Sequence, residues 1–234
     1  MATSGSTDFS LVTNTIIEEA FDLCGVGSEG EPISADMYSR ARRSLNLIVK
    51  TWATREHLWL RTSGSVTLVA SQGTYALATL FSVKPMRVLE VRRRVTSSSL
   101  DTPMNELARQ DYFELPNKAS EDKPISWYYD PQLSTGTLYV WPEPDTTTAS
   151  TMTLQLTYLR KIEDFDASDN DADLPQEWLQ ALTYALAEQL ALKYGVAGDI
   201  RSEIAGRAAA LMAQLEAFDN EPASLFLMPE RRWC

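Results

Sequence analysis

The spacing of apolar residues changes twice along the chain, from helical to alternating and back to helical. Apolar residues recur at three- or four-residue intervals over 9–23, which predicts a first helix. A second helix is predicted over 34–54, with Ser34 as its N-cap. Its core face would be formed by Ala41, Leu45, Ile48 and Trp52. The N-terminal end of the chain is therefore predicted to be a pair of amphipathic helices.

The middle of the chain has the alternating pattern of half-buried strands. Residues 65–70 and 74–77 flank the turn-forming sequence Ser71-Gln72-Gly73, and together they predict a β-hairpin. A short helix is predicted over 105–115, before Pro116. Further strands are predicted over 87–95, 125–129, 137–141 and 151–160.

Helical spacing returns after an acidic loop over 163–173. A helix over 175–194, ended by Gly195, is apolar on nearly every side, so we expect it to be buried and in part to meet a neighbouring subunit. A last helix is predicted over 199–218. Its packing stripe would consist of Ile200, Ile204, Ala208, Leu211, Leu215 and Phe218.

These elements predict an α+β fold. A helical core, made of the N-terminal and C-terminal helix pairs, would carry an inserted β-rich lobe and an extended C-terminal tail. The predicted boundaries are 1–62 and 163–219 for the core, 63–162 for the lobe and 220–234 for the tail.

Composition narrows the functional classes. The 234 residues are 44% hydrophobic and carry a formal net charge of −11, so the overall field opposes tight binding to a nucleic acid backbone. No apolar run is long enough to span a bilayer, and the first residues lack the pattern of a signal peptide. We therefore expect a soluble protein that is made in the cytoplasm and is not bound to a membrane.

Catalytic and metal motifs are weak. His57 is the single histidine, no nucleophile elbow is present, and Cys24 and Cys234 are expected to be free thiols. Gly25 to Gly30 match the G-x-G-x-x-G spacing, but they follow a helix instead of a strand. The acidic loop 163–173 lacks the glycine and the final glutamate of a calcium-binding loop. The sequence predicts no enzyme, no cofactor and no metal.

Two segments are candidate interface sites. The tail is rich in residue types that anchor protein interfaces, which favours docking on a partner; packing back on its own domain is the alternative. Its candidate residues are Leu225, Phe226, Leu227, Met228, Arg231, Arg232 and Trp233. The run Arg92, Arg93 and Arg94 favours a solvated or salt-bridged sheet edge, with contact to DNA or to an acidic neighbouring subunit as the alternative.

Three segments together resemble a known family. These are the helix containing Arg43 to Trp52, the strand Arg87 to Arg93 after Tyr75-Ala76-Leu77, and Asp173 to Leu182 continuing to Gly195. In order and spacing they resemble the head-to-tail adaptors, or tail accessory factors, of tailed phages, particularly the packaged-DNA stabilisation proteins of short-tailed bacteriophages. The resemblance covers most of residues 9–220.

The resemblance implies a structural subunit of the virion connector or neck, made in the bacterial host. Such adaptors assemble as a dodecameric ring beneath the portal protein. They extend the channel through which genomic DNA passes, retain the packaged DNA and provide a platform for the next tail protein, a nozzle or tail tube.

Two alternatives stay open at the level of sequence. The β-lobe aromatics Trp127, Tyr128, Tyr129, Tyr139 and Trp141 would suit a binding module of a phage tail that contacts a cell surface or a glycan. A cell-wall hydrolase would need a carboxylate acid in a cleft, and the sequence singles out no such pair.

Overall fold

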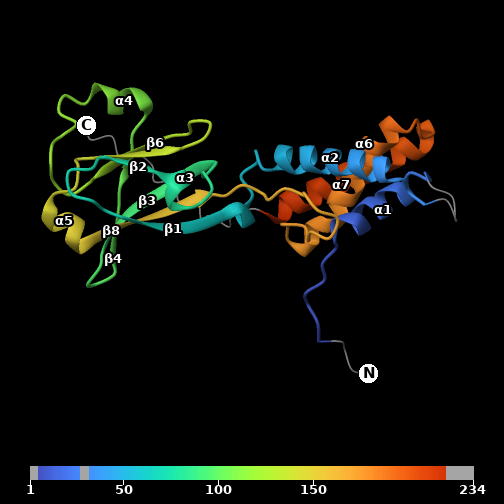
Figure 1. The fold of residues 1–234 in the computed structure, drawn as a ribbon, viewed down its shortest axis with the longest axis horizontal. Helices are drawn as coiled ribbons and strands as arrows, with labels where there is room; N and C mark the ends of the chain where they lie inside the picture. Colours follow the sequence, from blue (N-terminus) through green and yellow to red (C-terminus); the bar gives the residue numbers. More distant parts are fainter. Residues whose placement is uncertain (1–4, 27–31, 220–234) are drawn as a thin grey trace, which may run out of the picture. The chain divides into compact units, whose positions relative to one another are not determined.

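The computed structural model describes residues 5–26 and 32–219, in which the chain forms seven α-helices and two sheets. The predicted α+β class is confirmed. The chain divides into two compact units, one formed by Met1–Val49 with Asp164–Cys234 and the other by Lys50–Glu163. The first unit is helical and the second is rich in β-structure (Figure 1). The tail from residue 220 lies outside the described residues.

The helical unit contains α1, α6, α7 and nearly all of α2, with a short 3-10 turn, η2, leading directly into α6. Ser34 caps α2, because its Oγ accepts a hydrogen bond from the backbone N–H of Met37 at 3.3 Å. Gly195 ends α6 with a φ of +66°, the left-handed conformation that glycine adopts without strain. The bounds are α1 (Thr13–Leu23), α2 (Ala35–Trp52), η2 (Gln176–Trp178), α6 (Leu179–Lys193) and α7 (Gly198–Phe218).

The core of the helical unit is centred on α6. Eight of its residues are buried, and α1 and α7 both pack against it. The helix that the sequence predicts to be apolar on all sides is therefore covered largely by its own chain. Among its large apolar side chains, Leu192 is 63% exposed and Tyr184 is half-buried. The buried apolar side chains include Ile16, Ile17, Phe21, Leu45, Leu182, Leu186 and Leu190.

The β-rich unit is built from two four-stranded sheets, with strand orders β1-β8-β3-β4 and β2-β7-β6-β5. All pairings are antiparallel except β5 with β6. The strands are β1 (Arg61–Thr67), β2 (Thr74–Ala76), β3 (Arg87–Val95), β4 (Leu100–Pro103), β5 (Asn105–Glu106), β6 (Ser126–Asp130), β7 (Thr137–Trp141) and β8 (Met152–Leu159). The short helices are η1 (Leu58–Leu60), α3 (Leu77–Leu80), α4 (Arg109–Glu114) and α5 (Thr146–Thr151).

One hydrophobic core joins the two sheets. Leu154 and Leu156 of β8 are fully buried in this core. From the other sheet, Leu138 is also fully buried, and Trp127 is 2% exposed. The apolar residues that alternate along β8 in the sequence therefore point into this core, and the polar residues between them point to the outer face of the sheet. The same cluster contains Val66, Leu68, Tyr75, Leu77, Val88, Val91, Met104 and Val140.

The predicted hairpin over 65–77 is wrong. β1 pairs with β8, while β2 pairs with β7 in the other sheet. The turn between them, with Ser71 at a φ of 58°, carries the chain from one sheet to the other. Both flanking segments bury apolar residues in the shared core, so alternation alone does not reveal that their partners differ.

Two other predicted elements need correction. The start of the predicted helix over 105–115 is strand β5, which pairs in parallel with β6, and α4 begins only at Arg109. The arginine run also does not lie at a sheet edge, because β3 is flanked by β8 and β4. The predicted strand over 87–95 is confirmed as β3, and the strand over 137–141 as β7.

Candidate interface surfaces

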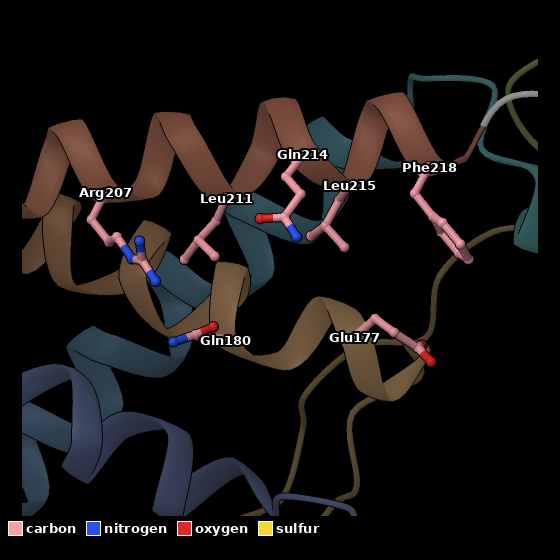
Figure 2. A pocket seen from close by; sticks show the side chains of 7 residues that line it. All are labelled: Glu177, Gln180, Arg207, Leu211, Gln214, Leu215 and Phe218. Atoms are coloured by element: carbon pink, nitrogen blue, oxygen red, sulfur yellow. The ribbon is translucent and has the colours of Figure 1, made fainter.

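A groove between the start of α6 and the second half of α7 is the first candidate surface (Figure 2). Its volume is about 410 Å³. Leu211, Leu215 and Phe218 recur along one side of α7 at spacings of four and three residues, so their side chains share one face. Glu177 and Gln180, from η2 and the first turn of α6, line the other side, as Figure 2 shows.

The exposure of the groove's apolar side chains differs along α7. Leu215 is 9% exposed and packs inward, whereas Phe218 is 80% exposed at the last position of the helix. Ile200, at the other end of the predicted stripe, is 41% exposed. Only the central part of the predicted stripe is therefore buried within the chain. Large exposed aromatics beside partly buried leucines are typical of protein interaction surfaces.

A second hollow, of about 730 Å³, lies beside the first half of α7. It is lined by Leu23 of α1, Tyr184 of α6 and a series on α7 that includes Gly206 and Ala210. The small residues leave room on this side of α7 where another helix can approach closely.

A third hollow, of about 610 Å³, is basic, and we call it the basic hollow. It is lined by Arg40, Arg43 and Leu47 of α2 together with Lys193 and Tyr194 at the end of α6. Leu47 is an apolar residue on an otherwise polar face of the helix, and it is 65% exposed. An exposed leucine among cations is the sequence signal that could have identified this site, and sequence reasoning missed it.

The basic hollow is held by contacts within the helical unit. The Lys193 ammonium donates a hydrogen bond to Oγ of Ser44, which is buried in α2. Arg40 forms an exposed ion pair with Asp36 at 2.7 Å, a contact of little energetic weight. The Tyr194 ring packs edge-on against Phe21, with 5.4 Å between ring centroids. Arg43 is exposed and forms no ion pair within residues 5–26 and 32–219.

The acidic loop 163–173 is fixed to the helical unit by its backbone from Phe165 onward. The Asn46 side chain binds the backbone of Phe165, and Arg42 Nη1 donates to the carbonyl oxygen of Asp166 at 3.0 Å. The backbone N–H of Thr13 donates to the carbonyl oxygen of Asn170 at 2.9 Å. The side chains of Asp166, Asp169 and Asp171 remain exposed. The loop therefore presents carboxylates in a defined arrangement.

The three arginines that the sequence singles out all have partners in the β-rich unit. Arg94 binds both carboxylate oxygens of Asp101, at 2.6 and 2.7 Å, and this pairing lowers the pKa of Asp101. Arg93 donates to the carbonyl oxygen of Pro124 at 2.9 Å, and Arg92 to Oγ1 of Thr157 at 3.2 Å. Their contact with DNA or with another subunit stays a prediction, as do the tail residues 225–233, which lie outside the described residues.

The lobe aromatics pack mostly inward. Trp127 and Tyr128 are 2% and 8% exposed, and Tyr128 stacks on Tyr139 with 5.7 Å between ring centroids. The Tyr129 hydroxyl donates to the carbonyl oxygen of Pro85 at 2.7 Å, and burial raises the pKa of Tyr129 to about 12. Trp141 Nε1 donates to the carbonyl oxygen of Asn117 at 2.9 Å. Most of these aromatic faces are therefore engaged within the lobe.

The residues with catalytic potential lie in packing environments. His57 is 4% exposed and stacks on Trp59. Cys24 is a buried free thiol that donates to the carbonyl oxygen of Ala187, and burial raises its pKa to about 11, so it stays protonated at neutral pH. Cys234 and most of the predicted glycine motif lie outside the described residues. Within the described part of the chain, no three His, Cys, Asp or Glu side chains gather as a metal site.

None of the described helices combines the length and the apolar character that a bilayer-spanning segment needs.

Comparison with known proteins identifies the family. The family model described as SU10 adaptor protein matches residues 15–226. No curated protein matches the chain. A solved structure, the neck of an empty GTA particle, is similar at 13% identity over 79% of this chain and 82% of that chain, with a TM-score of 0.28 that is too low to support an inference. The chain therefore belongs to the SU10 adaptor protein family, in agreement with its predicted resemblance to phage head-to-tail adaptors.

Proposed function

We propose that the protein is a structural subunit of a phage head-to-tail connector. In this role, copies of the chain form a ring beneath the portal protein, extend the DNA channel, retain the packaged genome and provide the attachment platform for the next tail protein. The ring would be dodecameric and would be part of the virion neck, after synthesis in the host cytoplasm. Membership of an adaptor family over residues 15–226 is the observation that carries this proposal.

The helical unit supplies surfaces that suit such a ring. The helical unit has three hollows on its surface: the groove beside Phe218, the hollow beside Gly206 and the basic hollow. The helices that line them already bury their core faces within their own chain. Surfaces of this kind do not stabilise the monomer, so they are available to a second subunit or to a portal. We also propose that the predicted core segments and the lobe over 63–162 serve separate roles, with the core forming the ring.

The acidic character of the chain supports a channel role. A channel wall with net negative charge repels the DNA backbone, so the genome can slide along it without binding. The formal charge of −11 has the sign that this role needs. The three consecutive arginines of β3, Arg92 to Arg94, make contacts within the chain, which reduces their capacity to hold phosphate groups.

The two alternatives have less support. A glycan-binding module would need exposed aromatic faces, but Trp127, Tyr128 and Tyr129 are engaged within the lobe. A cell-wall hydrolase would need a carboxylate whose pKa is raised so that it can act as an acid. Hydrogen bonds from neighbouring side chains lower the pKa of Asp8, Asp101 and Asp145, which is the opposite of the direction that an acid catalyst needs.

Labelling of intact virions tests the proposal directly. Gold-conjugated antibodies against the chain, applied to virions and viewed by electron microscopy, should mark the junction of head and tail. Particles stripped of their tails should keep the label and expose more of it. Label at the tips of fibres would contradict the connector role and favour a cell-surface binding module. Virions with no label at all would contradict both.

A further inference from the structure

The negative charge of the protein is concentrated in the helical unit. This unit contains 20 acidic and 8 basic residues, whereas the β-rich unit contains 12 acidic and 13 basic residues. Copies of the helical unit placed side by side in a ring would therefore repel one another. Assembly needs at least one place at which opposite charges of neighbouring copies meet.

The basic hollow has the required charge. Arg40, Arg43 and Lys193 are three of the eight basic residues of the helical unit, and all three line this one depression. Each is exposed, and Leu47 adds apolar surface among them. A carboxylate-bearing segment fits such a site, because it can pair with the cations while its apolar atoms cover Leu47.

The acidic loop 163–173 has the complementary charge. Its exposed carboxylates include Asp166, Asp169 and Asp171, and neither Asp169 nor Asp171 forms an ion pair within the described residues. The loop is already ordered by backbone hydrogen bonds to Asn46, Arg42 and Thr13. Little conformational entropy is therefore lost when it docks.

The loop cannot reach the basic hollow of its own chain. It is attached to α2 through residues 42 and 46, whereas the hollow is lined by residues 40, 43 and 47. At 3.6 residues per turn, these two sets point roughly 110° apart around the helix axis. The two surfaces thus flank the solvent-facing side of α2, one on each side. Only a second copy can bring a loop of this kind into the hollow.

We propose that the acidic loop of one copy docks in the basic hollow of the next copy, and that this contact repeats around the ring; this inference rests on the proposed connector function. The contact joins two different surfaces, so it is heterologous, and contacts of this kind generate closed rings when the rotation between copies closes. The partner at this site is a second copy of the same chain.

Charge reversal on each side of the contact tests the proposal. The variants Arg43→Glu and Asp169→Lys each place like charges opposite one another in every contact. When mixed with purified portal rings and analysed by mass photometry, each variant alone should need at least about tenfold more protein than the wild type for a filled ring. Arg201→Glu and Asp22→Lys change the net charge equally at exposed positions elsewhere in the helical unit, and they should assemble as the wild type does.

An equal mixture of the two variants provides the decisive result. When the variants alternate around an even-membered ring, the reversed hollow of one copy meets the reversed loop of its neighbour. At the next contact the unchanged Arg43 meets the unchanged Asp169, so assembly should return to near the wild-type level. Recovery would also show that both variants are folded.

The outcomes separate the contact from the connector function. If Arg43→Glu assembles normally, or if the mixture does not recover, the proposed contact is wrong while the connector function stands. If the wild type forms no ring on the portal, the connector function itself fails, and this contact with it.

Discussion

The side chain of Asn46 is hydrogen-bonded twice to the backbone of Phe165. Its Nδ2 donates to the carbonyl oxygen at 3.0 Å, and its Oδ1 accepts from the N–H at 2.9 Å. One amide side chain thus satisfies both the N–H and the carbonyl group of a residue 119 positions away in the sequence, as a neighbouring β-strand would. This pairing holds the acidic loop against α2 and also buries Phe165, which is 3% exposed.

Removing that side chain should loosen the loop. Asn46→Ala leaves two partly buried backbone groups without partners, so we expect the free energy of unfolding to fall by about 1–3 kcal/mol. Hydrogen exchange at the Phe165 amide should become faster. Asn14→Ala is the matched control, because no side-chain hydrogen bond of Asn14 is present among the described residues. Equal stability of the two variants would contradict the structural role of Asn46.

The packing of α6 predicts a contrast between two leucines. Leu186 is fully buried, so Leu186→Ala should lower the free energy of unfolding by about 2–5 kcal/mol through lost burial and a residual cavity. Leu192, on the same helix, is 63% exposed. Leu192→Ala should therefore change the free energy of unfolding by less than about 0.5 kcal/mol. Chemical denaturation monitored by circular dichroism measures both. A large effect at Leu192 in the isolated chain would show that α6 is packed differently.

The buried thiol of Cys24 predicts a dependence on alkaline pH. Its folded-state pKa is raised from 9.0 to about 11, so folding favours the protonated form. The stability linked to this thiol is fully present below pH 9 and is lost as the pH rises toward 11. In a Cys234→Ser background, Cys24 should resist alkylation at about pH 8 until the protein is unfolded. The difference in stability between this protein and its Cys24→Ala variant should shrink as the pH rises from 9.0 to about 11, and a constant difference would contradict the assignment.

The groove along α7 predicts an effect on assembly without an effect on folding. Phe218 is 80% exposed, so Phe218→Ala should leave the melting temperature nearly unchanged while it weakens binding to neighbouring subunits or to the portal. Leu133→Ala, at a position 95% exposed in the β-rich unit, is the control for loss of exposed apolar surface. Co-sedimentation with portal rings measures how much of each variant binds, and Phe218→Ala should bind less than Leu133→Ala. Equal binding by the two variants would show that the groove is not an interface.

The sequence predicts the four long helices, α1, α2, α6 and α7, well because their signals are local. Ser34 marks the start of α2 and Gly195 marks the end of α6. The strands β3 and β7 are also predicted from local pattern, whereas β4 is not predicted and β5 falls in a predicted helix. The pairing of β1 with β8 and of β2 with β7 depends instead on residues far apart in sequence. Local alternation carries no information about that choice.

The candidate surfaces are harder to predict for the same reason. Arg43 and Lys193 are 150 residues apart, and only the packing of α2 beside the end of α6 brings them to one hollow. The arginines of β3 are conspicuous in the sequence, yet the partners of Arg92 and Arg93, Thr157 and Pro124, come from distant segments. Charge runs are easily seen in a sequence, whereas charge clusters that form by folding are not.

The most direct test of the connector function is the light-scattering mass of the chain mixed with purified portal rings. We predict that each portal ring gains as many 26.2 kDa chains as it has subunits, and that deletion of residues 220–234 abolishes this gain. A portal ring whose mass does not change in the presence of excess full-length chain would contradict the connector function.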